Sequence, residues 1–316
     1  MRADAMAAHQ TTVPEGVAVP KPGPGRPPAC AAPLREVRFP RFALPPDACD
    51  SHLHILGPSE NFPYVEDRVY TPPDCLLGDY QALQDCLGVS RCVLVQASVY
   101  GSDNRVLLQA LEALGNAARG VAVLRGDEPE EKLQAMHRLG VRGARVNLVD
   151  VKTPGAALPL AHLQRMSEVL APLGWHLELL VHVDQHPDLD TQLGDLGVPL
   201  VFGHMGYLSK DVRNFRCPGM RAMLDLMRAG RAWAKVTAPY RLDAPPVYGK
   251  AADIAQWLAI GCADRLVWGS DWPHVMVKTD MPHDADLLDL VAAWLPDPAQ
   301  QQALFVSNPA RLYGWA

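Results

Sequence analysis

Two short segments, far apart in the sequence, carry side chains that could do chemistry together. The first, residues 50–54 (Asp-Ser-His-Leu-His), holds a His-x-His pair in a predicted strand, where alternation places His52 and His54 on one side. The second, residues 268–274, contains Asp271 just after the apolar residues of another predicted strand. If the two strands are neighbours, two imidazoles and a carboxylate meet, a group that can bind a divalent metal or activate water.

The elements that must position these residues can be read from the alternation of segments after residue 38. Eight short, largely apolar segments are predicted to be strands: residues 48–56, 91–98, 120–125, 143–148, 176–182, 199–204, 232–238 and 266–271. Helical patterns lie between them, for example at residues 103–115, 130–140, 160–174, 220–230 and 252–262. Strands that alternate with helices indicate a parallel sheet and an α/β fold.

A closed sheet is the simplest way to make the first and last strands neighbours. A (β/α)8 TIM-like barrel does this, and it collects catalytic residues at the carboxyl ends of its strands. The rival, an open doubly wound sheet, often has a glycine-rich phosphate loop after its first strand, and residues 57–64 contain no such motif. We therefore predict a single-domain barrel over residues 39–316 and, over residues 1–38, a disordered leader rich in Ala, Pro and Gly.

Histidines at the predicted strand ends extend this candidate site. The fifth and sixth strands end at His182 and His204, which a barrel would bring to the same mouth as the first and last strands. Imidazole and carboxylate suit a divalent metal such as zinc or manganese. The candidate ligands are His52, His54, His182 and Asp271. A metal held there would acidify a bound water, whereas without a metal Asp271 could itself be the general base.

Two arginines are candidates for binding an anionic substrate. Arg145 lies inside the apolar fourth strand, and Arg241 follows the seventh. A charged side chain in such a strand must be paired or face the barrel mouth, because burying it alone is costly. Two guanidinium groups facing one pocket would suit substrate carboxylates, while the alternative for each is an internal salt bridge.

Composition limits the partners. The net charge of −6 argues against nucleic acid and anionic membranes, and no segment has the length and hydropathy of a membrane span. Seven scattered cysteines without a C-x-x-C motif indicate reduced thiols and a cytoplasmic protein. The expected partner is a small anionic molecule, and the sequence leaves the oligomeric state open.

Together these motifs resemble the amidohydrolase superfamily, specifically amidohydrolase-related family 2. Its barrels carry His-x-His on the first strand and Asp on the last. A closer match, covering residues 50–313, is to the group of lactonases that includes 2-pyrone-4,6-dicarboxylate hydrolase. The segments that carry it are residues 62–64, 70–72, 95–98, 101–105, 204–206, 268–274 and 308–313.

The resemblance implies hydrolysis of the ring ester of a carboxylated lactone. Asp271 would activate water, and His52, His54 and His204 would polarise the carbonyl. Substrate and its carboxylates would be held by Tyr70, Ser98, Arg145 and Arg241. Metal-independent catalysis stays open, because the pyrone hydrolase resembles a metal-independent branch, whereas His182 would complete the histidine set of metal-dependent relatives.

Two departures from the pyrone hydrolase widen the expected substrates. Leu180 stands where that enzyme has a tyrosine, and a second arginine is replaced near Val151, which Lys152 follows. A muconolactone-like or sugar-acid lactone would therefore fit as well as 2-pyrone-4,6-dicarboxylate. The rival functions are a superfamily decarboxylase of an aromatic or unsaturated acid, a lactone isomerase, and a non-catalytic ligand-binding barrel.

Overall fold

The computed structural model describes residues 27–150 and 157–315 and confirms the predicted barrel. Eight parallel strands pair in sequence order, each with the next. They are β1 Cys49–Leu53, β2 Arg91–Val95, β3 Ala118–Ala122, β4 Val141–Asn147, β5 His176–Leu180, β6 Leu200–Phe202, β7 Ala232–Val236 and β8 Leu266–Trp268. Most of the expected leader, together with Val151 and Lys152, lies outside the described residues.

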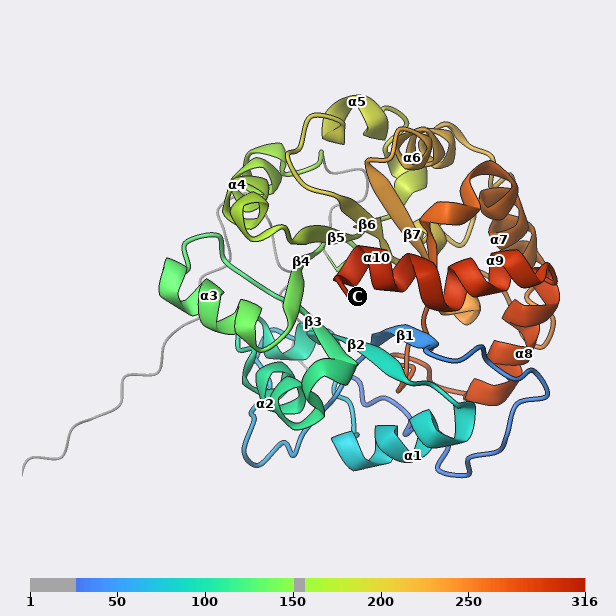
Figure 1. The fold of residues 1–316 in the computed structure, drawn as a ribbon, viewed down its shortest axis with the longest axis horizontal. Helices are drawn as coiled ribbons and strands as arrows, with labels where there is room; N and C mark the ends of the chain where they lie inside the picture. Colours follow the sequence, from blue (N-terminus) through green and yellow to red (C-terminus); the bar gives the residue numbers. More distant parts are fainter. Residues whose placement is uncertain (1–26, 151–156, 316) are drawn as a thin grey trace, which may run out of the picture.

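Helices surround the strands in a ring (Figure 1). They are α1 Leu77–Leu87, α2 Arg105–Leu114, α3 Glu130–Arg138, α4 Leu160–Leu170, α5 Leu189–Leu193, α6 Pro218–Arg228, α7 Gly249–Cys262 and α8 Asp284–Trp294, followed by α9 Pro298–Gln302 and α10 Asn308–Tyr313. The large apolar core includes side chains of both layers, such as Leu94 on β2 and Leu107 on α2. No helix among the described residues is long and apolar enough to cross a membrane.

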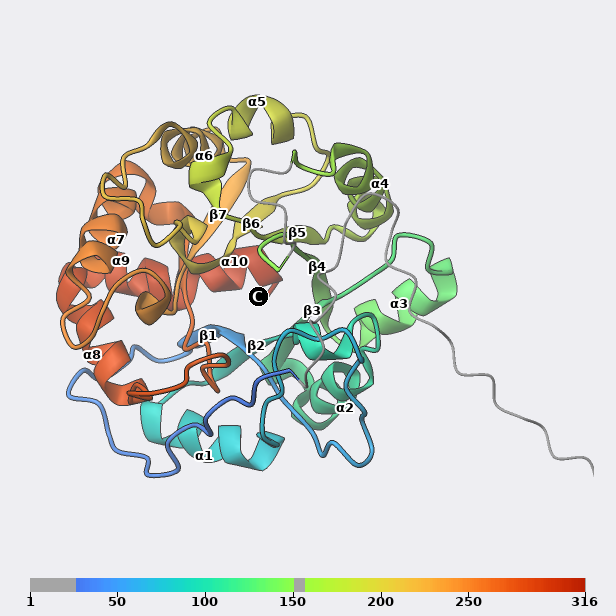
Figure 2. The ribbon, with the colours of Figure 1, turned by 180° about the vertical axis from the view of Figure 1, so that it is seen from behind.

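One end of the barrel is covered by its own C-terminal helix. In Figure 1, α10 crosses this end of the barrel in front of the strands, and in Figure 2 it lies behind them. Tyr313 of α10 is fully buried in a cluster with Cys49, the first residue of β1, and with Val121 of β3. The opposite end, at the carboxyl ends of the strands, is where the fold places its loops and any active site.

The barrel closes between β1 and the segment after β8, at the residues that are predicted to be catalytic or to bind a metal. The backbone N–H of Asp271 donates to the carbonyl of His52 at 2.8 Å, and that of His54 donates to the carbonyl of Trp272 at 2.8 Å. Gly269 permits this approach, because a Cβ there would lie 2.6 Å from the backbone nitrogen of His52. These backbone hydrogen bonds between residues 52–54 and 271–272, the seam of the barrel, therefore hold the His-x-His pair beside Asp271.

Asp50 fastens the same seam with its side chain. Its Oδ1 accepts hydrogen bonds from the backbone N–H groups of Ser270 at 2.9 Å and His52 at 3.1 Å. Its Oδ2 accepts from the Ser270 hydroxyl at 2.6 Å and the Tyr80 hydroxyl at 3.2 Å. Burial raises the pKa of Asp50 to about 6, although the bonds from Ser270 and His52 oppose this rise. The carboxylate thus depends on these donors to remain charged inside the protein.

We expect Ser270→Ala to lower the free energy of unfolding by about 1–3 kcal/mol at pH 7, because it removes a donor to a buried carboxylate. The loss should be smaller at pH 5, where a larger fraction of Asp50 is protonated and needs the donor less. Urea unfolding at both pH values measures this, with Ser90→Ala as the control because Ser90 is exposed. Equal losses for the two variants would contradict the role of Ser270 in closure.

The strands end earlier than predicted. His54, His182, His204 and Asp271 all follow their strands instead of ending them, and Ser98 begins a 3-10 turn. The backbone explains two of these differences: His204 has φ 48° and Asp271 has φ 63°, left-handed conformations that a strand cannot contain. Those turns redirect the two side chains across the mouth of the barrel.

The packed chain also begins before residue 39. Ala29 forms an isolated parallel bridge with Thr71, and the backbone N–H of Cys30 donates to the carbonyl of Thr71 at 2.9 Å. Further along, Arg38 forms an ion pair with Asp286 of α8. Residues 28–38 therefore contact the barrel, in contrast to the disordered leader expected as far as residue 38.

Candidate active site

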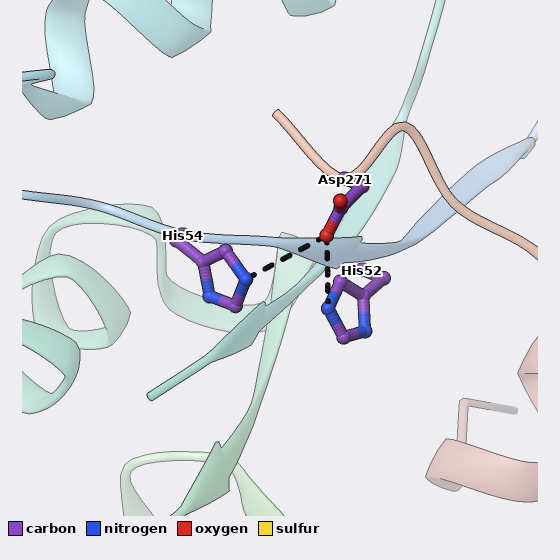
Figure 3. Close-up of side chains that lie close together, drawn as sticks. All are labelled: His52, His54 and Asp271. Atoms are coloured by element: carbon purple, nitrogen blue, oxygen red, sulfur yellow. Dashed lines mark ion pairs between the residues drawn. The ribbon is translucent and has the colours of Figure 1, made fainter. Parts of the chain in front are cut away.

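Three imidazoles surround one oxygen of Asp271 at the carboxyl ends of the strands. The Nε2 atoms of His52, His54 and His204 lie 3.4, 3.7 and 4.0 Å from Asp271 Oδ1. Figure 3 shows the His52 and His54 rings converging on that oxygen, as the strand alternation predicts. All four side chains are buried. The group that sequence analysis assembles from three strand ends is thus brought together.

The other oxygen of Asp271 is occupied by the protein itself. Asp271 Oδ2 accepts from the Tyr240 hydroxyl at 2.6 Å, and from Arg241 through Nε at 3.1 Å and Nη2 at 2.9 Å. Burial alone would raise the pKa of Asp271, but Arg241 and His204 outweigh it and hold this pKa well below its usual range. Asp271 is therefore an ionised carboxylate, and its Oδ1 accepts no hydrogen bond from the described residues.

Arg241 thus adopts the internal salt bridge that was the alternative to substrate binding. It also lines the pocket described below, so a contact with substrate remains a prediction for this side chain.

Two of the neighbouring histidines, His52 and His204, are neutral. Burial lowers the pKa of His52 to about 3 and that of His204 well below its usual value, because a charged imidazole loses its hydration inside the protein. The Nδ1 of His204 lies 2.6 Å from the Thr237 hydroxyl, which fixes the ring. Neutral imidazoles beside an ionised carboxylate favour base catalysis.

We expect kcat/KM to vary little between about pH 5 and about pH 8, because Asp271 keeps its charge there and His52 and His204 stay neutral. Initial rates across this range, with a substrate whose own groups do not titrate in it, measure the effect. An acidic limb with a midpoint between about pH 6 and about pH 7 would show that an essential histidine titrates there instead.

A pocket of about 390 Å³ opens beside this group. Seven of the nine residues predicted from sequence line it: His54, Tyr70, Ser98, Arg145, His204, Arg241 and Asp271. Leu180 and Asp150 also line it, and these residues lie at or beside the two departures that the resemblance implies. Substrate choice is therefore open to change at both positions.

Arg145 is a cation of this pocket that forms no ion pair with a carboxylate of the described residues. It is 8% exposed, and its Nη1 donates to the carbonyl of Gln96 at a long 3.4 Å. Its Nε is buried without a hydrogen-bond partner, and Arg145 forms no ion pair with any residue in the described part of the chain. Such a group is suited to receive a carboxylate from a ligand.

The spacing of three ligand atoms also fits a small divalent cation. One atom each of His52, His54 and Asp271 lies within 4.8 Å of the others, and His52 Nε2 and Asp271 Oδ1 are buried without hydrogen-bond partners. His182 does not belong to this group: its Nδ1 faces the backbone carbonyl of Tyr207, and its ring packs 4.9 Å from the Tyr207 ring. The donor set is thus smaller than the four ligands that sequence analysis expects.

Sequence analysis missed three residues around this site. Tyr240 binds Asp271, while Lys235 of β7 and Glu178 of β5 form a fully buried ion pair of 2.6 Å behind His52. A signal for the ion pair exists in the sequence, since Lys235 and Glu178 are each the one Lys, Arg, Asp or Glu of a largely apolar strand, Ala-Trp-Ala-Lys-Val and His-Leu-Glu-Leu-Leu.

The fold and this site define the class of the protein: residues 49–315 match the Amidohydrolase family model, and the chain belongs to that family. It is 35% identical to the 2-pyrone-4,6-dicarboxylate hydrolase of Comamonas testosteroni over 87% of this chain and 92% of that protein. It is 34% identical to the 4-sulfomuconolactone hydrolase of Rhizobium radiobacter over 91% of this chain and 96% of that one.

A solved structure is similar as well. It is that of a probable 2-pyrone-4,6-dicarboxylic acid hydrolase from Acinetobacter baumannii with citric acid bound, and it is 25% identical to this chain. The TM-score is 0.74, and the match covers 85% of this chain and 100% of that one.

Proposed function

We propose that this protein hydrolyses the ring ester of a small lactone that carries a carboxylate. The observation that carries the proposal is the pairing of two features in one pocket: the ionised Asp271 with a free Oδ1, and the buried Arg145, which forms no ion pair with the described residues. The first suits activation of water, and the second suits a substrate carboxylate. The named lactone hydrolases among the relatives, and the citric acid in the similar structure, support this chemistry and the anionic substrate.

In the proposed reaction, a water beside Asp271 attacks the lactone carbonyl. A proton of the water passes to Asp271 Oδ1 as the new C–O bond forms, and the bond from the carbonyl carbon to the ring oxygen then breaks. Asp271 Oδ1 returns its proton to that ring oxygen as it leaves, so the carboxylate is regenerated and the product is an open hydroxy acid or its keto tautomer. In this proposal the imidazoles of His52, His54 and His204, which lie around Asp271 Oδ1, contact the water and the carbonyl oxygen.

Tyr70 and Ser98 are proposed to orient the ring. Their hydroxyl oxygens lie 3.5 Å apart on the pocket wall, so they can bind the same part of a ligand. A divalent metal such as zinc or manganese, if held by His52, His54 and Asp271, would supply Lewis acidity and a more acidic water. The roles of the arginines and hydroxyls in binding are the same with or without it.

The direct test is to incubate the purified protein with 2-pyrone-4,6-dicarboxylate and follow the ultraviolet absorbance of the ring, with and without prior chelation. We expect rapid loss of absorbance with one new carboxylate for each ring opened. If chelation abolishes the activity and zinc or manganese restores it, the metal is required; unchanged activity means that Asp271 and the histidines suffice.

A panel of lactones decides the substrate, because Leu180 and Asp150, at or beside the expected departures from the pyrone hydrolase, line the pocket. The panel adds a muconolactone, a 4-sulfomuconolactone and a sugar-acid lactone, each assayed by product chromatography. Carbon dioxide released without ring opening would contradict hydrolysis and indicate a decarboxylase. A rearranged lactone would indicate an isomerase, and binding without turnover of any compound would indicate a ligand-binding barrel.

A further inference from the structure

The buried lysine behind His52 makes three polar contacts. Lys235 Nζ lies 2.6 Å from Glu178 Oε2, 2.8 Å from the backbone carbonyl oxygen of Ser51, and 3.1 Å from Nδ1 of His52. Lys235, Glu178 and His52 come from three different strands and are each at most 1% exposed, so solvent does not compete for these contacts. An ammonium group has three N–H donors and no acceptor, which matches the three acceptors around Nζ.

The match determines which ring nitrogen of His52 carries the proton. If Nδ1 accepts a hydrogen bond from Lys235, it has no proton, and the proton of the neutral ring is on Nε2. The competing arrangement would have Nδ1–H donate to Glu178 Oε1, but that pair is 3.4 Å apart, beyond ordinary N–H···O length. We propose that Lys235 is a positioning residue that holds His52 in the Nε2–H form, with this N–H directed at the site.

His54 is held in the opposite form. Its Nδ1 lies 2.8 Å from the backbone carbonyl oxygen of Val95, which can only accept, so Nδ1 carries the proton and Nε2 presents a lone pair. The two histidines of the His-x-His pair thus have different chemistry toward the same carboxylate oxygen, although they are one residue apart in the sequence.

The difference gives each ring a role that rests on the proposed function. A water beside Asp271 Oδ1 can accept a hydrogen bond from His52 Nε2–H while it donates one proton to Asp271 Oδ1 and the other to His54 Nε2. Both water protons then have acceptors, and the second lone pair of the water is left for attack on the carbonyl carbon. The same arrangement opposes a metal at His52, because Nε2 must lose its proton before it can coordinate.

The first test determines which ring nitrogens of His52 and His54 are protonated, in the intact protein without substrate. Protein labelled with ¹⁵N-histidine is treated with a chelator at neutral pH, and the ring nitrogens are observed by long-range ¹H–¹⁵N correlation, with His52→Gln and His54→Gln variants for assignment. We expect His52 to show a protonated Nε2 and a bare Nδ1, and His54 the reverse. A protonated Nδ1 on His52 would overturn the proposal.

The second test uses variants and zinc alone as the probe. In Lys235→Met, Nδ1 of His52 can donate to Glu178 and Nε2 becomes a lone pair, so we expect the His52 spectrum to change form and Zn²⁺ to bind about tenfold or more tightly. Glu178→Gln keeps the lysine donor, so His52 should stay in its Nε2–H form and Zn²⁺ affinity should not rise. Lys250→Met, which removes a lysine bound to the carbonyl of Val212, is the matched control.

The two tests separate this proposal from the proposed function. The wild-type spectrum is decisive even if Lys235→Met fails to fold, and neither measurement requires turnover of a lactone. Unchanged zinc affinity in a folded Lys235→Met protein would show that Lys235 does not control the ring. Failure of every lactone assay together with the expected spectrum would reject the reaction and leave the proton assignment standing.

Discussion

Asp271→Asn is expected to lower kcat for lactone hydrolysis by about 10²–10⁴-fold, the usual contribution of a positioned general base. The amide has nearly the shape of the carboxylate, so the barrel seam can form, since it uses the backbone N–H of Asp271. What is lost is the acceptor at Oδ1, around which His52, His54 and His204 are placed. Initial rates at saturating substrate measure the effect.

The control for Asp271→Asn is a second ion-paired carboxylate away from the pocket. Asp289 on α8 pairs with Arg41 at 3.1 Å and accepts from the backbone N–H of Phe42 at 2.8 Å. We expect Asp289→Asn to change stability while leaving kcat near that of the wild type. Near-full activity of a folded Asp271→Asn protein would remove Asp271 from the role of base and, with it, the proposed mechanism.

The centre of the site could be predicted from the sequence because it follows from one-dimensional rules. Alternation along a strand puts His52 and His54 on one side, and eight strand and helix units put the end of β8 beside β1. The structure confirms both inferences, since the two imidazoles converge on Asp271. Strand alternation and strand order were enough to predict this meeting of His52, His54 and Asp271.

Contacts that depend on register and on turns could not be predicted in the same way. The meeting of Lys235 with Glu178 and His52 requires the relative heights of three strands, which apolar patterns do not specify. The bond from Arg241 to Asp271 requires the turn after β7 and the left-handed backbone of Asp271. For the same reason His182, although it lies at the carboxyl end of the barrel as expected, faces the carbonyl of Tyr207 and lies apart from the group that could bind a metal.

The specificity for a carboxylated ring is expected to depend on Arg145 more than on any other cation of the pocket. Arg241 already binds Asp271, and Lys235 is buried behind His52, so each has a protein carboxylate beside it. Arg145 has no ion pair with a described residue and has a buried Nε without a partner. A substrate carboxylate would supply both the missing charge and the missing acceptor.

We therefore expect Arg145→Met to raise KM for a carboxylated lactone by about 10–100-fold, because a hydrogen bond to a charged group contributes about 1.5–3 kcal/mol. The kcat should change much less, since Asp271 and the imidazoles are untouched. The matched control is a neutral lactone without the carboxylate, whose kcat/KM should be the same in wild type and variant. Arg145→Lys should recover part of the affinity, because it restores the charge without the planar fork. An equal loss of kcat/KM on the neutral lactone would mean that Arg145 maintains the shape of the pocket and does not bind the carboxylate of the substrate.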